Sequence, residues 1–82
     1  MLTVHVRLFA SLRDAAGIEA CQLRLEPSAC GVDAKVALVQ QYHRLKGLIE
    51  YARLAVNREY QPWETPLHHG DEVSVIPPVS GG

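Results

Sequence analysis

The residues with the clearest potential for chemistry in this sequence are its last two. The printed chain ends Val79-Ser80-Gly81-Gly82, directly after a Pro77-Pro78 pair. Two glycines carry no side chain, so they can enter a narrow channel and adopt backbone angles that other residues avoid. The group they offer is the α-carboxylate of Gly82, which is ionised at neutral pH and becomes a good electrophile only after activation. The pattern indicates a tail that another enzyme acts on; a chance Gly-Gly ending or a cloning remnant are the alternatives.

Other reactive side chains give weaker signals. Ser80 has no His or Asp placed in the sequence to activate it, so we interpret it as a small polar spacer. Cys21 and Cys30 lack the spacing of a C-x-x-C redox or zinc motif, and we expect both to be reduced. His68-His69 precede Asp71, but adjacent histidines in a turn rarely converge on one ion. We therefore expect solvated loop residues and no metal site.

Composition narrows the class of protein. The 82 residues form one small domain with 48% hydrophobic and 21% charged residues, as expected of a folded globular chain. The net charge is −1, from 8 basic and 9 acidic residues. The sequence contains no basic stripe that would predict nucleic-acid binding. The sequence contains no run of about 18 apolar residues, so we expect no membrane span. The first residues alternate like a strand and do not resemble a signal peptide, so we expect a cytoplasmic protein.

The hydropathy pattern predicts the elements that must position the tail. Period-2 alternation indicates strands, and a change to helical spacing near residue 31 indicates one main helix. The stretch 48–53 is ambiguous. The predicted order is a strand over 2–10, a helical turn over 11–17, a strand over 19–26, a helix over about 31–45, a strand over 54–57, a tiny strand near 60 and a strand over 72–76.

One amphipathic helix and one sheet can bury their apolar faces only against each other. With the first and last strands meeting at the sheet centre, this order predicts an α+β fold of the β-grasp type. We expect a mixed four- to five-stranded sheet packed on one main helix over residues 1–76, and an extended, mobile tail over 77–82. The predicted core consists of Val4, Val6, Leu8, Leu23, Leu25, Val36, Val39, Val56, Val73 and Val75.

Phe9 falls on the polar face of the first strand, opposite the predicted core residues. Beside Ile76 and Leu67 it would form an exposed apolar patch of the kind that binds a partner. A Phe9 side chain that is covered locally is an equally good interpretation of the sequence alone.

Four segments, in order along the chain, carry a resemblance to a known family. They are Leu8 to Arg13 followed by Gly17, Leu54 to Asn57, Pro66-Leu67 followed by Gly70 to Val73, and Pro77 to Gly82. With these segments the sequence resembles the small sulfur-carrier subunit of molybdopterin synthase. That subunit belongs to the ubiquitin-like β-grasp carriers, which include the thiazole-synthesis sulfur carrier. The final hexapeptide is the specific part of the match.

The resemblance implies a sequence of reactions at Gly82. An ATP-dependent activating enzyme would adenylate its carboxylate, and a sulfur donor would displace AMP to leave a thiocarboxylate. The large subunit of the synthase would bind the carrier through Phe9, Leu67 and Ile76. The tail would then deliver sulfur to cyclic pyranopterin monophosphate in molybdopterin biosynthesis. On this view the chain binds no cofactor, ATP is used by the activating partner, and the chain is not catalytic alone.

Three other functions stay open at this level. The first is a sulfur carrier for thiamine thiazole or cysteine synthesis, against which the Pro-Pro-Val-Ser segment before the glycines argues. The second is a ubiquitin-like protein modifier joined to lysines through Gly82. The third is a β-grasp interaction module with an incidental Gly-Gly ending. An autonomous enzyme is disfavoured because the sequence contains no acid–base constellation.

Overall fold

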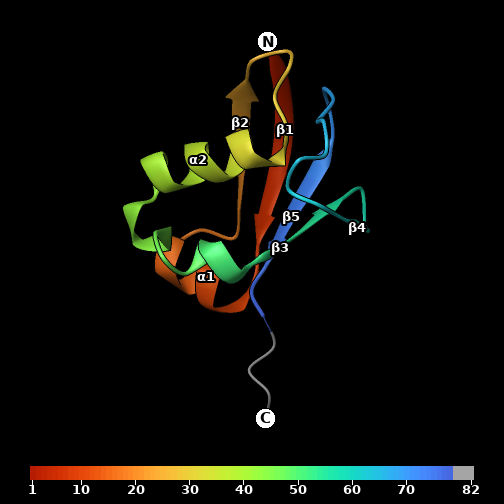
Figure 1. The fold of residues 1–82 in the computed structure, drawn as a ribbon. Helices are drawn as coiled ribbons and strands as arrows, with labels where there is room; N and C mark the ends of the chain where they lie inside the picture. Colours follow the sequence, from red (N-terminus) through yellow and green to blue (C-terminus); the bar gives the residue numbers. More distant parts are fainter. Residues whose placement is uncertain (79–82) are drawn as a thin grey trace.

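The computed structural model describes residues 1–78, and the predicted tail positions Val79, Ser80, Gly81 and Gly82 lie outside the described residues. Five strands, two α-helices and two short 3-10 helices make up the described chain (Figure 1). In chain order these are β1 (Leu2–Leu8), α1 (Ala10–Ala16), β2 (Ala20–Leu25), α2 (Gly31–Gln41), η1 (His43–Leu45), η2 (Ile49–Tyr51), β3 (Arg53–Val56), β4 (Glu59–Gln61) and β5 (Glu72–Ile76).

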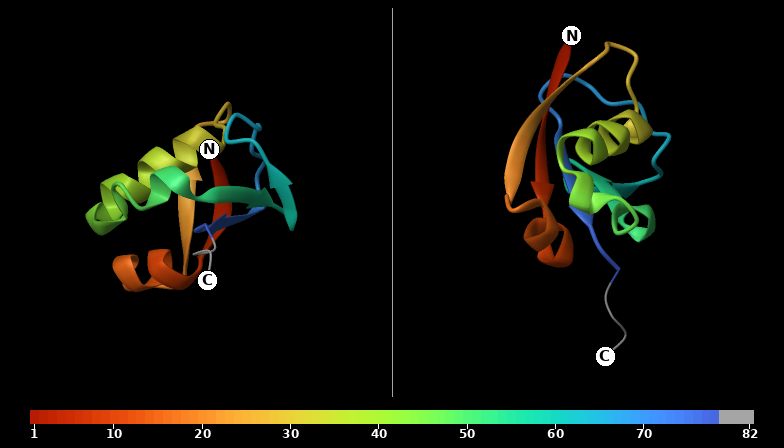
Figure 2. Two further views of the ribbon diagram at one scale, coloured as in Figure 1. Left: turned by 60° about the horizontal axis from the view of Figure 1, so that its bottom comes forward. Right: turned by 90° about the vertical axis from the view of Figure 1, so that its left-hand side faces the viewer.

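The strands form one mixed sheet in the order β2-β1-β5-β3-β4. The first and last strands pair in parallel at its centre, and the other neighbouring strands are antiparallel. The long helix α2 lies across one face of the sheet, and no helix of residues 1–78 lies across the other face (Figure 2). This arrangement is the predicted α+β β-grasp, with β4 as the small strand expected near Tyr60.

Strand alternation explains which face is buried. In β1 the side chains of Val4, Val6 and Leu8 point toward α2 and are buried, while His5 and Arg7 point to the open face. Because directly paired residues share a face, the register carries this division across the sheet. The pairing of Leu8 with Val75, and of Val75 with Leu54, makes one continuous apolar layer beneath the helix.

The predicted face of α2 is wrong. We expected Val36 and Val39 to be core residues, but Val36 is 50% exposed and Val39 is only partly buried. The helix instead buries Gly31, Ala34 and Leu38, which recur at the i, i+3, i+7 spacing of one helical face. The prediction followed the valines because they are more apolar than glycine and alanine. The small residues are the buried ones, because they allow the helix to lie closer to the sheet.

Short helical segments supply core residues that periodicity did not identify. Leu12 of α1, Leu45 of η1 and Ile49 of η2 are almost completely buried. The α-helix ends at Gln41 rather than Leu45, and the ambiguous stretch forms η2. The full core cluster is Leu2, Val4, Val6, Leu8, Leu12, Leu23, Leu25, Ala29, Ala34, Leu38, Leu45, Ile49, Ala52, Leu54, Leu67, Val73 and Val75, with Val56 partly buried against it.

Gly31 starts α2 at a point where the backbone approaches a neighbouring loop closely. A Cβ atom at this position would lie 2.6 Å from the Trp63 carbonyl oxygen and 2.6 Å from a methyl carbon of Leu54. The same loop accepts the first amide hydrogens of the helix, from Gly31 to the Thr65 carbonyl at 3.0 Å and from Val32 to the Trp63 carbonyl at 2.9 Å. Glycine therefore lets α2 begin with its amides satisfied by the loop.

A two-residue turn joins β3 to β4. Asn57 and Arg58 have φ angles of 51° and 72°, which is the pair of positive values that a type I′ hairpin requires. Asparagine tolerates this region, whereas arginine adopts it at a cost. Among residues 1–78 no helix is long and apolar enough to cross a membrane.

Candidate functional site: the base of the tail

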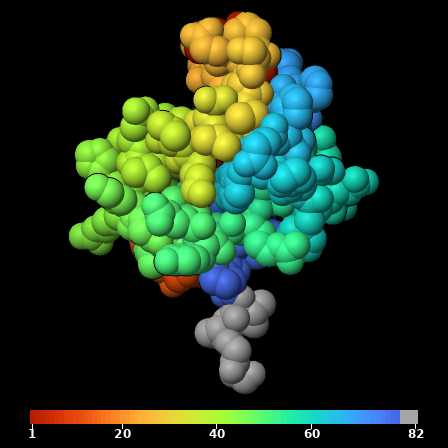
Figure 3. Space-filling view, in the orientation of Figure 1, coloured from red at the N-terminus to blue at the C-terminus, as the bar shows by residue number. Residues whose placement is uncertain are grey.

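The tail leaves the sheet from its most central position. β5 ends at Ile76, and Pro77 follows directly. Proline has no amide hydrogen, so it cannot continue the hydrogen-bond ladder with the strands on either side. The end of β5 reaches the molecular surface between α1 and the segment that contains η2 (Figure 3). The fold therefore places the start of the tail at the surface of a rigid sheet.

Phe9 lies beside this point, one residue after the end of β1. Because Leu8 pairs with Val75 in the parallel ladder, Phe9 and Ile76 are at the same level, one strand apart. The Phe9 carbonyl accepts hydrogen bonds from the Leu12 and Arg13 amides at 3.1 and 3.3 Å, so the start of α1 fixes the Phe9 backbone. Its side chain is 38% exposed, and the expectation of an aromatic residue available at the surface is confirmed.

Arg53 and Tyr60 complete the surroundings of the tail base on the other side of β5. Arg53 is the pairing partner of Ile76, and Tyr60 is the pairing partner of Ala55 on the neighbouring strand. The Arg53 guanidinium lies over the Tyr60 ring, 4.2 Å from its centre. Tyr60 is 58% exposed. We call the group Phe9, Ile76, Arg53 and Tyr60, on the open face of the sheet, the tail-side surface.

Leu67 does not belong to this surface, and its predicted place in an exposed patch is wrong. Its side chain is 3% exposed and packs in the core, while its amide donates to the Ala29 carbonyl at 3.0 Å. The loop that follows it reaches β1 at Thr3, where the Gly70 amide donates to the Thr3 carbonyl at 2.8 Å. From there to Phe9 the strand spans about 20 Å. Leu67 therefore lies near the opposite end of the sheet.

The sequence contained a signal for Tyr60 that the prediction did not use. Alternation along a hairpin places every second residue on one face, and the turn at 57–58 fixes which residue of the short strand opposes Ala55. Ala55 is on the open face because its neighbour Leu54 is buried against α2. Counting across the turn would have placed Tyr60 on the open face. The prediction instead relied on Leu67, whose apolar character reflects the core.

The two cysteines are free thiols in the structure. Burial raises the pKa of the Cys21 thiol above its usual value, and a hydrogen bond with Tyr42 lowers it in part. A raised pKa reduces the fraction of reactive thiolate at neutral pH. Cys21 faces the helix side of the sheet as the partner of Val6. A role for this thiol in carrying sulfur is therefore disfavoured by its surroundings.

The histidine pair belongs to a structural network at the far end of the sheet. Asp71 is 8% exposed and accepts hydrogen bonds from the His68 amide at 2.7 Å and from the Asn57 side chain at 2.9 Å. The His69 Nδ1 atom accepts from the Thr3 amide at 3.0 Å, so this ring is more than a solvated side chain. Within residues 1–78 no group of three His, Cys, Asp or Glu residues could hold a metal ion.

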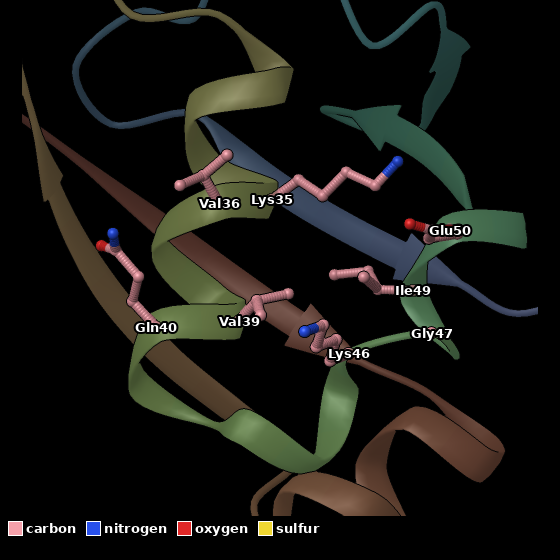
Figure 4. A pocket seen from close by; sticks show the side chains of 8 residues that line it. All are labelled: Lys35, Val36, Val39, Gln40, Lys46, Gly47, Ile49 and Glu50. Atoms are coloured by element: carbon pink, nitrogen blue, oxygen red, sulfur yellow. The ribbon is translucent and has the colours of Figure 1, made fainter.

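A pocket of about 300 Å³ lies on the helix side of the molecule, between α2 and the segment around η2 (Figure 4). Val36, Val39 and Ile49 form its apolar walls, and Lys35 and Lys46 lie at its edges. The Lys35 ammonium also lies over the Trp63 ring, 4.8 Å from its centre. Of residues 1–78, only Glu50 contributes a carboxylate to the lining, and these residues give the pocket no pair of carboxylates for acid–base catalysis.

Comparisons with known proteins agree with this architecture. Residues 6–82 match the ThiS family. A molybdopterin synthase sulfur carrier subunit from Mycobacterium tuberculosis is 34% identical over 83 residues, covering 100% of both chains. The crystal structure of SAMP1 from Haloferax volcanii superposes with a TM-score of 0.90 at 27% identity, covering 98% of this chain and 99% of that one. A complex of subunits 1 and 2 of molybdopterin-converting factor from Helicobacter pylori contains a similar chain, with a TM-score of 0.71, 27% identity and coverage of 99% and 100%.

Proposed function

The chain belongs to the ThiS family, and on this premise we propose that it carries sulfur on Gly82 for molybdenum cofactor biosynthesis. The observation that carries the proposal is the match to a molybdopterin synthase sulfur carrier subunit over the whole chain, which includes the Pro-Pro-Val-Ser-Gly-Gly segment. In this role Gly82 ends the tail and presents its carboxylate. The cytoplasm stays the expected location.

The proposed chemistry requires two enzymes that act on the same carboxylate. An ATP-dependent activating enzyme joins the Gly82 carboxylate to AMP and releases pyrophosphate. A sulfur donor then attacks the acyl carbon and displaces AMP, which leaves a C-terminal thiocarboxylate. This group is anionic and nucleophilic at neutral pH, so it can pass its sulfur to cyclic pyranopterin monophosphate in the large subunit of the synthase. In this proposal the partner enzymes supply the acids and bases for these steps.

The shape of the tail base supports this division of labour. Residues 77–82 can span about 20 Å when extended, which is enough for the glycines to reach into another protein's active site. The sheet holds the start of the tail in a fixed place, and the tail-side surface offers exposed aromatic area next to it. Exposed aromatic residues are typical anchors of protein–protein interfaces. We propose that the large subunit binds there, as the two-subunit complex from Helicobacter pylori suggests by analogy.

The decisive experiment is measurement of intact mass after reaction. The protein is incubated with an activating enzyme, ATP and a sulfide source, and we expect replacement of one oxygen by one sulfur at the C-terminus. A variant that lacks Gly82 serves as the matched control and should keep its original mass. An unchanged mass for the wild type, or the same change in the control, would contradict the proposal. Transfer from the loaded protein to the pterin substrate in the presence of the large subunit tests the final step.

A protein modifier is the second candidate, because the fold superposes on SAMP1 with a TM-score of 0.90, above the 0.71 for the chain in the Helicobacter pylori complex. The Haloferax volcanii protein also carries the name small archaeal modifier protein 1. The same activated Gly82 could form an isopeptide bond with a lysine. In this case cells that express a tagged chain would contain lysines of other proteins joined to Gly82. Their presence in the wild type and loss in the Gly82 deletion would favour the modifier. Thiocarboxylate without such adducts would favour the carrier.

A further inference from the structure

The open face of the sheet has two halves that differ in charge. The half far from the tail carries His5 and its pairing partners Gln22 and Glu72, so basic and acidic groups lie together there. In the half next to the tail, Arg7 pairs with Ala20 and Ser74, and Arg53 pairs with Ile76. The strand residues of this half include two arginines and no carboxylate. The tail-side surface therefore combines apolar area with positive charge.

The ion pairs of residues 1–78 leave the two arginines without a carboxylate partner. Within residues 1–78, neither Arg7 nor Arg53 takes part in an ion pair. Ser74 and Ala55, which separate the two arginines across the sheet, have small side chains that carry no charge. Both arginines are exposed residues and lie in the half of the sheet next to the tail. A partner that covers this surface without carboxylates would have to desolvate two positive charges without compensation.

The stacking of Arg53 on Tyr60 adds a geometric argument. A guanidinium group that lies over an aromatic ring uses its face for that contact, while its N–H donors point outward from the edge. This arrangement limits the rotamers of the arginine before any partner arrives. Donors in the fixed plane of a guanidinium match the two oxygens of a carboxylate. Because Arg53 pairs with Ile76, this prepared donor edge lies directly beside the start of the tail.

We propose that Arg53, together with Arg7, binds carboxylates of the protein that docks on the tail-side surface, so that the surface selects an apolar patch bordered by Asp or Glu. The inference rests on the proposed function, because the partner considered is the large subunit of the synthase. Charge complementarity of this kind speeds the encounter and sets its orientation. It would align the partner at the point where the tail must enter its active site.

The test measures association of the full chain with the recombinant large subunit from the same organism at several salt concentrations. For Arg53→Glu we expect about tenfold weaker binding at about 20 mM salt, mostly through slower association, with the difference shrinking to about twofold at about 0.5 M. The matched control is Arg24→Glu, which makes the same charge change on the open face at the opposite end, as the partner of Thr3. The control should stay within about twofold of the wild type.

Two further variants separate charge from geometry. Arg53→Lys keeps the positive charge but loses the planar donor edge, so its affinity should fall between those of the wild type and Arg53→Glu. Arg7→Glu should reproduce the salt dependence of Arg53→Glu to a smaller degree, because Arg53 stacks on an aromatic ring and Arg7 does not do so within residues 1–78.

Each outcome has a separate meaning. If Arg53→Glu and Arg24→Glu weaken binding equally, only net charge matters and the inference is wrong, while the carrier function stands. If Arg53→Glu binds like the wild type at low salt, the inference is likewise overturned. If the wild-type chain does not bind the large subunit at all, the proposed partner and this inference both fail. Thermal unfolding of each variant confirms that the fold is intact before binding is compared.

Discussion

The two faces of the central sheet differ in the side chains that they carry and in how far these side chains are exposed. The face beneath α2 is a continuous layer of buried aliphatic side chains, such as Val6, Leu8 and Val75, that holds the domain together. The open face of the same strands exposes Arg7 and, at its tail end, Phe9 and Tyr60. Neighbouring residues of one strand thus lie in the core or at the surface according to parity, and the recognition role is proposed for the surface set. Substitutions on the two faces should therefore have separable effects.

The largest expected effect comes from a charge on the helix side. Val6 is fully buried in the middle of β1, so Val6→Asp would place an unpaired carboxylate in the core. The expected cost is about 4 kcal/mol or more, which is comparable to the whole stability of a small domain. Circular dichroism should show an unfolded chain at room temperature. A cooperative melt near that of the wild type would mean that the face assignment of β1 is wrong.

A matched pair on α2 sharpens the comparison within one helix. Leu38→Ala removes a fully buried side chain and should lower the free energy of unfolding by about 2–4 kcal/mol. Val36→Ala removes a half-exposed side chain, and the better helix propensity of alanine should keep the change within about 0.5 kcal/mol. Urea unfolding of both variants measures the difference. Equal losses of unfolding free energy in the two variants would show that α2 buries the face that contains Val36, as first expected.

The next effect concerns binding on the open face. Phe9→Ala should weaken binding of the large subunit by about 1–3 kcal/mol, or about 5- to 150-fold, because one aromatic anchor often dominates an interface. The melting temperature should stay close to that of the wild type. Val36→Ala, an apolar truncation on the opposite side of the molecule, provides the binding control. If Phe9→Ala unfolds the domain, Phe9 is a core residue rather than a docking residue.

The smallest effect is a gain in stability at the hairpin turn. Arg58 has a φ of 72°, which is unfavourable for a residue with a Cβ atom. Arg58→Gly should raise the free energy of unfolding by about 0.5 kcal/mol, since the relief of strain exceeds the added flexibility of the unfolded chain. The melting temperature should rise by about 2–4 °C. Glu59→Gly, one residue further and inside β4, should lower it instead.

The sequence predicted the strands well because a half-buried strand has a simple signature. β1 alternates between buried and more exposed residues, and in β5 the apolar Val73 and Val75 alternate with polar residues up to Ser74. The meeting of the two strands at the sheet centre followed from the order of elements. The helix face was missed because close packing of α2 depends on Gly31 and Ala34, whose small size gives almost no hydropathy signal. The 3-10 segments were missed because three residues are too few to show a period.

For the candidate site, the sequence placed Phe9 at the surface but misplaced one neighbour, and the role of the tail stays a prediction. Leu67 is apolar because it packs in the core, and hydropathy alone cannot separate an apolar core residue from an apolar contact residue. Arg53 and Tyr60 were not predicted as a pair, although both belong to one hairpin, because the prediction did not use the register that the turn at 57–58 sets between the two strands. The hydrogen bonds of the buried Asp71 were not predicted. Its role depends on Asn57, which lies 14 residues away in the sequence.

The central position of β5 also bears on how the chain is made. Both neighbours of β5, the strands β1 and β3, depend on it for their pairing in the middle of the sheet. Contacts between the beginning and the end of a chain form late, because a long loop must close before they contribute. A polypeptide interrupted before Glu72 would lack the strand that completes the core. A chain that reaches the native state therefore already contains β5, the strand that leads into the tail.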